Sequence, residues 1–363
     1  MILNSVLPFV GIIIALIVAH ELGHFITAKL TGVRVLEAGL GYPPRLWGFQ
    51  YKETVYSVNA LPLGGFVRLM GEEDPSDPAS LAAKPHWVRL LVLASGSGAN
   101  FLLPLVLFSI SFMIPRDVST GLTQITLVIP GSPAAEAGLT EGDVIFAING
   151  HTVRNTAEVG TQVRLNMGET LTMTVKHEGE VKDVPVKARW APPTYIDAEG
   201  NEKQQGPTGI VIAPLYPGMT ESESFPPWKA FPKSIEATTQ SLTPARNEII
   251  SWFKGGSQPG VAGPVGIAQA TGEVVEESGY RPLLDFAAIL SINLGIVNIL
   301  PIPMLDGGRM IFVLLEIVRR GKRIAPEKEA LVHFIGFVLI ITFAVAVTYF
   351  DVLRILRGES LFG

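Results

Sequence analysis

The chain has 363 residues, of which 48% are hydrophobic and only 17% are charged, and its formal net charge is −5. Soluble domains carry roughly 25% charged residues, so this composition favours a membrane protein, and the mild acidity gives no reason to expect nucleic acid as a partner. The chain has no cysteine, which excludes disulfides, thiolate zinc sites and cysteine nucleophiles.

Four long apolar stretches follow one another along the chain. Each is long enough for a membrane-spanning helix, which needs roughly 20 mostly apolar residues. The stretches cover residues 6–30, 88–114, 283–318 and 331–350. Lys and Arg gather between the first two and between the last two stretches, so both short loops are expected in the cytoplasm and both termini outside. We expect a multi-pass protein of the bacterial cytoplasmic (inner) membrane, because no transit peptide precedes the first stretch.

These spans divide the chain into four predicted parts. The parts are a first membrane half (1–114, with a cytoplasmic-side β-loop at 32–71), an extracytoplasmic insert (115–217), a linker (218–282) and a second membrane half (283–363). The β-loop is rich in Val, Tyr, Phe and Trp, with Gly and Pro between them, which is typical of hairpins. It is unusually apolar, so we expect it to associate with the membrane. Spaced apolar residues in the linker predict an amphipathic helix over residues 225–253.

Local signals predict a β-rich insert. Two hairpin turns are expected, one at Asn149-Gly150 and one at Glu178-Gly179. A short helix is expected directly after Ser132, which is a favourable capping residue followed by proline.

The first apolar stretch contains His20, Glu21 and His24 in the pattern HELGH. On a helix, the two histidines share a face and can hold one zinc ion, while the glutamate lies beside them as a general base for a metal-activated water. A charged residue near the middle of a membrane costs at least ~2.5 kcal/mol. Three ionisable residues so close together in a spanning helix therefore indicate a function, although a histidine pair can also make purely structural hydrogen bonds.

A catalytic zinc needs a third protein ligand, and Asp306 is the candidate in the third apolar stretch. Pro301 and Pro303 would break the helix just before it, and broken helices within a membrane line cavities. As an alternative, Asp306 could cap a helix at the cytoplasmic interface. Asn100, in the second stretch, could either reach the site or bond a neighbouring helix, and the sequence leaves both open.

At these motifs the chain resembles the site-2 protease family of intramembrane zinc metalloproteases. HELGH matches in the first stretch, and NILPIPMLDGG matches in the third. The family pattern Asn-x-x-Pro-x-x-x-Leu-Asp-Gly is met by Asn298, Pro301, Leu305, Asp306 and Gly307. SGSGANF resembles the family's Gly-x-x-x-Asn segment, with serine where many members have proline. The insert, with VIPGSPAAEAGLTEGDVIFAING, resembles a single PDZ domain of the circularly permuted bacterial type.

The resemblance covers nearly the whole chain, and its arrangement is similar to that of bacterial regulators of intramembrane proteolysis. It implies a polytopic α-helical membrane protein of about four transmembrane helices, with a membrane-associated β-hairpin region and an inserted extracytoplasmic β-rich PDZ domain. The lipid bilayer is then its surroundings, and the active site is expected toward the cytoplasm.

The resemblance also implies residue roles. His20, His24 and Asp306 would hold one Zn²⁺ per chain, Glu21 would be the general base for attack by zinc-activated water, and Asn298 and Asn100 would contact the substrate or transition state. Substrates would be transmembrane segments of single-pass proteins, such as anti-sigma factors or signal-peptide remnants, held extended by strand addition. The PDZ domain would bind substrate C-terminal tails or act as a size filter.

Two other classes of protein stay open at this point. A zinc transporter would also use intramembrane His and Asp, but it needs neither Glu21 as a base nor the insert. A catalytically silent scaffold would need the insert alone, and the intact HELGH motif disfavours it.

Overall fold

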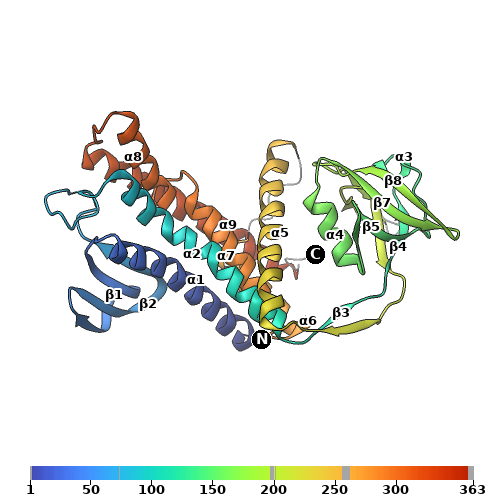
Figure 1. The fold of residues 1–363 in the computed structure, drawn as a ribbon, viewed down its shortest axis with the longest axis horizontal. Helices are drawn as coiled ribbons and strands as arrows, with labels where there is room; N and C mark the ends of the chain where they lie inside the picture. Colours follow the sequence, from blue (N-terminus) through green and yellow to red (C-terminus); the bar gives the residue numbers. More distant parts are fainter. Residues whose placement is uncertain (1, 73, 197–199, 201, 256–261, 359–363) are drawn as a thin grey trace. The chain divides into compact units, whose positions relative to one another are not determined.

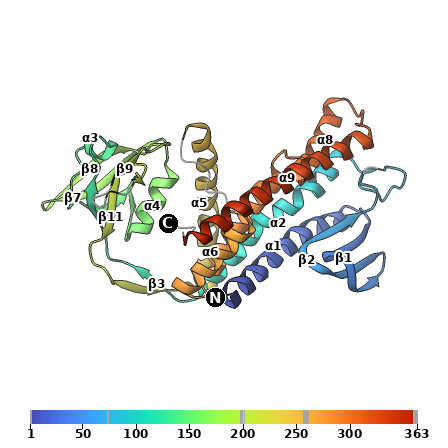
Figure 2. The ribbon, with the colours of Figure 1, turned by 180° about the vertical axis from the view of Figure 1, so that it is seen from behind.

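A computed structural model of the chain describes residues 2–72, 74–196, 200, 202–255 and 262–358. The chain forms two compact units. One unit comprises Met1–Ser111 with Val261–Gly363, and the other comprises Phe112–Gly260. Each is described by itself below, and Figures 1 and 2 show their elements from two sides.

The first unit, here called the helical unit, consists of long apolar helices and one β-hairpin. Its elements are α1 (Ile2–Leu30), β1 (Val35–Tyr51), β2 (Thr54–Leu69), α2 (His86–Met113), α6 (Pro264–Ser278), α7 (Leu283–Ile299), α8 (Asp306–Val318) and α9 (Pro326–Leu356). Among the described residues, α1, α2 and α9 are long and apolar enough to cross a membrane, while α7 is a shorter apolar helix of 17 residues. The expected third span is thus two helices, and the count of four full spans is not reproduced.

The break in the third span lies where the prolines predict it. α7 ends at Ile299 and α8 begins at Asp306. Pro301 cannot donate a backbone hydrogen bond and disfavours helical geometry in the residue before it. The connection then folds back so tightly that a β-carbon at Gly307 would overlap the carbonyl oxygens of Ile299 and Leu300. The break therefore places Asp306 at the first position of a new helix.

The predicted β-loop is an antiparallel hairpin, β1 with β2, whose strands are long and bent. The bends let Ala38 lie opposite both Val67 and Tyr56, so the two strands fold back into a narrow sheet. The β2 segment of this sheet packs against α1, because a β-carbon at Gly65 would lie 3.1 Å from the Glu21 side chain. Figures 1 and 2 both show the hairpin beside α1.

Glycine and charge fix the helices of this unit relative to one another. A β-carbon at Gly23 would overlap the carbonyl oxygen of Ser95, so α1 and α2 approach closely, as small residues allow in membranes. Buried Glu316 accepts a 2.6 Å bond from Arg89 and a 3.1 Å bond from Arg323, which ties the end of α8 to the start of α2.

The second unit contains the predicted insert and the first part of the predicted linker, and the name insert is used for the whole unit from here on. It is built on a sheet with strand order β11-β4-β5-β7-β8. Its elements are β3 (Arg116–Ser119), β4 (Thr123–Val128), α3 (Pro133–Glu136), β5 (Val144–Ile148), β6 (His151–Thr152), α4 (Thr156–Leu165), β7 (Thr170–His177), β8 (Glu180–Lys187), β9 (Thr194–Ile196), β10 (Glu202–Gln204), β11 (Ile210–Pro214), β12 (Thr220–Glu223) and α5 (Pro227–Phe253). A cluster of buried apolar side chains that includes Ile145, Leu171 and Val175 forms its core.

The local predictions in the insert are confirmed. Ser132 accepts a hydrogen bond from the Ala135 N–H at the start of α3. The Asn149 and Glu178 turns both have positive φ, as tight hairpins require. The amphipathic helix predicted in the linker over residues 225–253 is α5, which covers Pro227–Phe253. Helix α4 was not expected; its signal is Asn155, whose side chain accepts from Glu158 N–H.

Candidate metal centre

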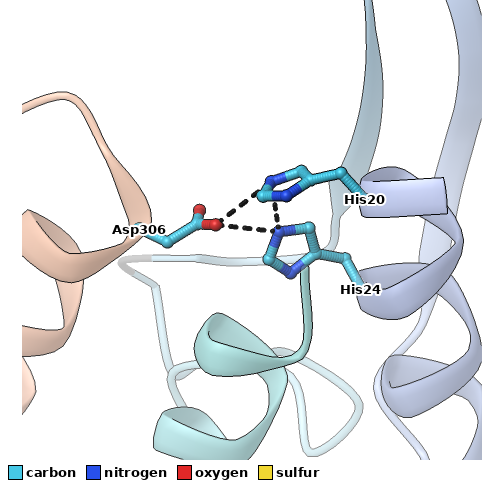
Figure 3. Close-up of side chains that lie close together, drawn as sticks. All are labelled: His20, His24 and Asp306. Atoms are coloured by element: carbon cyan, nitrogen blue, oxygen red, sulfur yellow. Dashed lines mark hydrogen bonds and ion pairs between the residues drawn. The ribbon is translucent and has the colours of Figure 1, made fainter. Parts of the chain in front are cut away.

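Three of the predicted site residues converge from α1 and α8. Figure 3 shows the imidazoles of His20 and His24, one turn apart on α1, facing the carboxylate of Asp306. Asp306 Oδ2 lies 3.2 Å from Nε2 of each histidine, and the two Nε2 atoms are 3.2 Å apart. Residues 282 positions apart in the sequence thus point three ligand atoms at one place.

The triangle of ligand atoms fits a small metal ion. Ligand atoms of a tetrahedral zinc lie about 2.0–2.2 Å from the ion and therefore about 3.3–3.6 Å from one another. The three separations of 3.2 Å are close to one face of such a tetrahedron. Two imidazoles and one carboxylate are also a ligand set of catalytic zinc sites, in which the fourth position stays open.

A hydrogen bond to the backbone sets the tautomer of His24. Its Nδ1–H donates to the carbonyl oxygen of Val92 on α2, at 2.8 Å. With the proton on Nδ1, the lone pair of Nε2 is free for a metal. Metal-binding histidines usually have such a partner, which orients the ring and raises its basicity.

Asn100 holds the corresponding place behind His20. Its amide nitrogen lies 3.2 Å from His20 Nδ1, while its fully buried carbonyl oxygen has no hydrogen-bond partner. Amide O and N are interchangeable by rotation. The rotated amide would accept from Nδ1–H, which satisfies the orphaned oxygen and leaves His20 Nε2 free. The buried amide of Asn100 therefore fits a metal bound to His20 Nε2, because it contacts the other nitrogen of the same imidazole.

Gly96 on α2 makes room for both imidazoles. A β-carbon there would overlap Nε2 of His24 and lie 2.7 Å from Cε1 of His20. A β-carbon placed at Gly98, two residues later, would have no neighbouring side chain or helix within 4 Å. Of the two glycines in the SGSGANF segment, only Gly96 is therefore required by the metal-site residues.

Glu21 lies at the wall of a polar cavity of about 370 Å³. The cavity is lined by His20, His24 and Asp306, by the β2 segment Gly65–Leu69, and by the charged residues Glu72 and Arg309. A β-carbon at Gly65 would lie 3.1 Å from Glu21 Cγ, so β2 packs directly against the Glu21 side chain. The carboxylate is therefore fixed beside the ligand atoms and open to the same cavity.

Helix α9 braces the loop that carries Asp306. His333 Nδ1 accepts a 2.8 Å hydrogen bond from the N–H of Met304. Met304 has φ +83°. This conformation costs a non-glycine residue of order 1–3 kcal/mol and persists only where the surrounding structure holds it. One turn along α9, a β-carbon at Gly336 would overlap Pro303. The sequence reasoning missed this brace, although a histidine within an apolar helix is itself a signal of function.

Asn298 is the predicted site residue that the structure does not bring to the cluster. It is half-buried in the last turn of α7, and among the described residues it is not in the lining of the polar cavity. Its contact with substrate remains a prediction.

Comparison with known proteins then identifies the family. The profile of peptidase family M50 matches residues 8–343. The chain belongs to peptidase family M50. It is similar to the zinc metalloprotease RasP of Geobacillus kaustophilus, at 30% identity over 96% of this chain and 98% of the relative. It is also similar to the regulator of sigma-W protease RasP of Bacillus subtilis, at 29% identity over 98% and 100% of the two chains. This member of family M50 is a zinc metalloprotease with apolar, membrane-type helices.

Among solved structures, the PDZ domain of an SdrC-like protein from Listeria monocytogenes is similar to part of the chain. The match has 23% identity and a TM-score of 0.21, and it covers 27% of this chain and 94% of the other. The PDZ domain of an SdrC-like protein from Listeria innocua matches with 24% identity and a TM-score of 0.19, over 25% and 92% of the two chains.

Proposed function

We propose that this M50 protease is an intramembrane endopeptidase that hydrolyses peptide bonds within the transmembrane segments of single-pass proteins. The observation that carries the proposal is the convergence of His20, His24 and Asp306 beside Glu21 in an apolar helix. His20, Glu21 and His24 lie within α1, which is long and apolar enough to cross a membrane. A peptide bond that reaches this site therefore comes from within the apolar layer.

In this proposal His20, His24 and Asp306 hold one zinc ion per chain. When bound, zinc acts as a Lewis acid and lowers the pKa of a bound water to about 7. Glu21 accepts the proton of the attacking water and returns it to the leaving amine nitrogen. The close packing of Gly65 in β2 against the Glu21 side chain keeps the carboxylate beside the cavity during both transfers.

The hairpin presents the substrate. A helical peptide bond is shielded by its own hydrogen bonds, so the scissile segment must be extended before attack. The β2 segment Gly65–Leu69 lines the cavity next to Glu21 and is already in strand conformation. We infer that the unwound substrate lies along this segment as an added strand, which supplies main-chain hydrogen bonds.

The proposal extends to location. Lys and Arg in the loops after α1 and α8 favour a cytoplasmic position for both loops, in a bacterial inner membrane. The insert is then extracytoplasmic and acts as a PDZ domain for substrate tails or as a filter on substrate size. Anti-sigma factors are the substrate class that the B. subtilis relative's name, regulator of sigma-W protease, favours.

The decisive experiment compares Glu21→Gln with wild type in liposomes, using a single-pass test substrate and zinc analysis of the same samples. We expect about one zinc per chain in both proteins and at least a 10³-fold loss of cleavage in the variant. Glu53→Gln, at the exposed tip of the hairpin, is the matched control and should cleave normally. Cleavage by Glu21→Gln at the wild-type rate would refute the general-base assignment.

Zinc content tests the ligands separately and needs no substrate. His24→Ala and Asp306→Ala should both lose zinc, because each removes one of three protein ligands. Full zinc in Asp306→Ala would leave the metal on the histidines alone and would refute a site that joins α1 to α8.

A further inference from the structure

A second cavity, of about 380 Å³, lies between α1 and the sheet face of the hairpin. Five aromatic side chains line it: Phe25, Trp47, Phe49, Tyr56 and Phe66. Several of their rings are in contact; Phe49 and Tyr56 are stacked with centroids 5.2 Å apart. We call this space the aromatic cavity.

The aromatic cavity and the polar cavity share one wall. Glu21, Gly65, Phe66 and Val67 line both spaces. On the metal side, the wall is followed by charged groups such as Glu72 and Arg309. On the other side, Glu21 and Ser57 are the polar residues of a lining that is otherwise aliphatic or aromatic. The general base thus stands between a polar and an apolar compartment.

We infer that the aromatic cavity is a specificity pocket for a large apolar side chain of the substrate, next to the scissile bond. This inference rests on the proposed function. Glu21 must reach the scissile bond, and a neighbouring residue lies only about 3.3–3.6 Å further along an extended chain. Its side chain must therefore enter one of the two compartments that Glu21 separates.

Polarity decides between the two compartments. Residues from a transmembrane segment are mostly apolar. Arg309 donates a 2.8 Å hydrogen bond to Glu72, and packing an apolar side chain against this ion pair would take both charged groups out of water, which costs free energy. In the aromatic cavity, the same side chain buries apolar area at roughly 25 cal/mol per Å². Successive side chains of an added strand point to opposite faces, so alternate residues can meet the two environments.

The cavity can be entered from the apolar layer. Trp47 is 60% exposed and Phe49 is 49% exposed, so the aromatic surface continues from the cavity to the outside of the hairpin. A lipid acyl chain could follow the same path. Continuity with Glu21 favours a substrate side chain as the occupant, because an acyl chain there would block the base.

The test is a cleavage series in liposomes with the full-length protein. The probes are single-pass test peptides with one mapped cleavage site, in which each residue flanking the cut is in turn Trp, Phe, Leu or Ala. Wild type should prefer Phe or Leu over Ala at one flanking position by about 10–100-fold in kcat/KM. Ala38→Leu narrows the cavity and should lower the Phe-to-Ala ratio at least tenfold.

Two further variants make the result specific. Phe49→Ala enlarges the cavity and should shift the preference toward Trp at the same position, which a folding defect would not do. Leu46→Ala is the control, because Leu46 is 69% exposed on the same strand and does not line the cavity, so its ratio should equal that of wild type.

Three outcomes would overturn the inference. In the first outcome, wild type shows no size preference at either flanking position. In the second, Ala38→Leu slows the cleavage of all peptides equally while retaining zinc. Either result would mean that the aromatic cavity does not bind the substrate side chain and would favour a lipid acyl chain as its occupant. Zinc-loaded wild type that cleaves none of the peptides would refute the proposed function itself, and the substrate pocket with it. The first two outcomes leave the protease proposal intact, because cleavage is still observed.

Discussion

The insert packs a core of apolar side chains, whereas the helical unit buries polar groups against glycine around its metal-site residues. In the insert, Ile145, Leu171 and Val175 are fully buried among other apolar side chains. In the helical unit, buried Asn100 on α2 contacts His20 on α1, and buried His24 on α1 packs against Gly96 on α2. The difference separates two uses of burial: the insert's core supplies folding free energy, and the helical unit's polar contacts fix a ligand geometry. Substitutions in the two regions should therefore fail in different ways.

The largest effect is expected for Gly96→Ala. Its new methyl group must displace the imidazoles of His20 and His24, so zinc affinity should fall by more than 100-fold while the helices stay folded. The measurement is zinc per chain in detergent-purified protein, with circular dichroism for helix content.

Gly98→Ala is the matched control for this prediction. It has open space around the added carbon and gains up to about 1 kcal/mol of helix propensity, so it should hold zinc like wild type. If both variants bind zinc equally well, the close contact of α2 with the histidines is wrong.

Leu171→Ala in the insert should have the opposite effect: the insert loses stability while the metal site keeps its zinc. Leu171 is 0% exposed, and truncating a core leucine costs about 2–5 kcal/mol. Hydrogen exchange of the β7 amides should speed up by the corresponding factor, while zinc content stays at the wild-type value, because the two units are separately compact. A loss of zinc in this variant would mean that the metal site depends on the folded insert.

Substitution of Asn100, which contacts the ligand His20, should lower zinc affinity by an intermediate factor. Asn100→Leu removes the partner of His20 Nδ1, and losing such a partner typically costs 10–100-fold in metal affinity. Asn100→Asp restores an acceptor and should regain most of the affinity, measured by competition with a chelator. Equal zinc affinity in Asn100→Leu and wild type would return Asn100 to the role of a substrate contact.

A smaller loss is expected at the brace on α9. His333→Leu removes the acceptor for Met304 N–H and lets the Asp306 loop relax, so zinc affinity should fall several-fold to about tenfold. His333→Asn places an oxygen near the position of Nδ1 and should restore it. If His333→Asn and His333→Leu behave alike, the hydrogen bond does not position the ligand.

The sequence reveals what is local and conceals what is tertiary. His20 and His24 share a helical face by spacing alone, and Pro301 predicts the break that starts α8 at Asp306. The hairpin turns of the insert are equally local. The partner of His333 is 29 positions away, and nothing near either residue indicates the pairing.

The same limit applies to the glycines and the hairpin. Gly96-x-Gly98 predicts a close approach of helices, but only the packed structure distinguishes the glycine that meets the histidines from the one that meets nothing. The bends that place Ala38 opposite two partners in the hairpin lie near Gly41 and Gly64, which both have positive φ; the glycines indicate a bend, but the pairing across it is tertiary. Shared walls between cavities depend on several such contacts at once, so they are beyond sequence patterns.

The smallest effect should come from a surface pair of the insert, where a charge adds little to the apolar core. Glu223 lies opposite Arg116 in the β3–β12 ribbon and also contacts Arg154. Burial alone would raise the pKa of Glu223, but hydrogen bonds and charge from Arg116 and Arg154 outweigh it and hold the pKa below its usual value. A carboxyl with a lowered folded-state pKa stabilises the fold above its unfolded pKa, and this contribution disappears as the pH falls through the folded pKa.

Glu223→Gln should therefore weaken hydrogen-exchange protection of the ribbon by about 0.2–1 kcal/mol at pH 7, as for other partly exposed pairs. The difference from wild type should shrink below about pH 4, and a difference that persists there would assign the effect to lost packing rather than to charge.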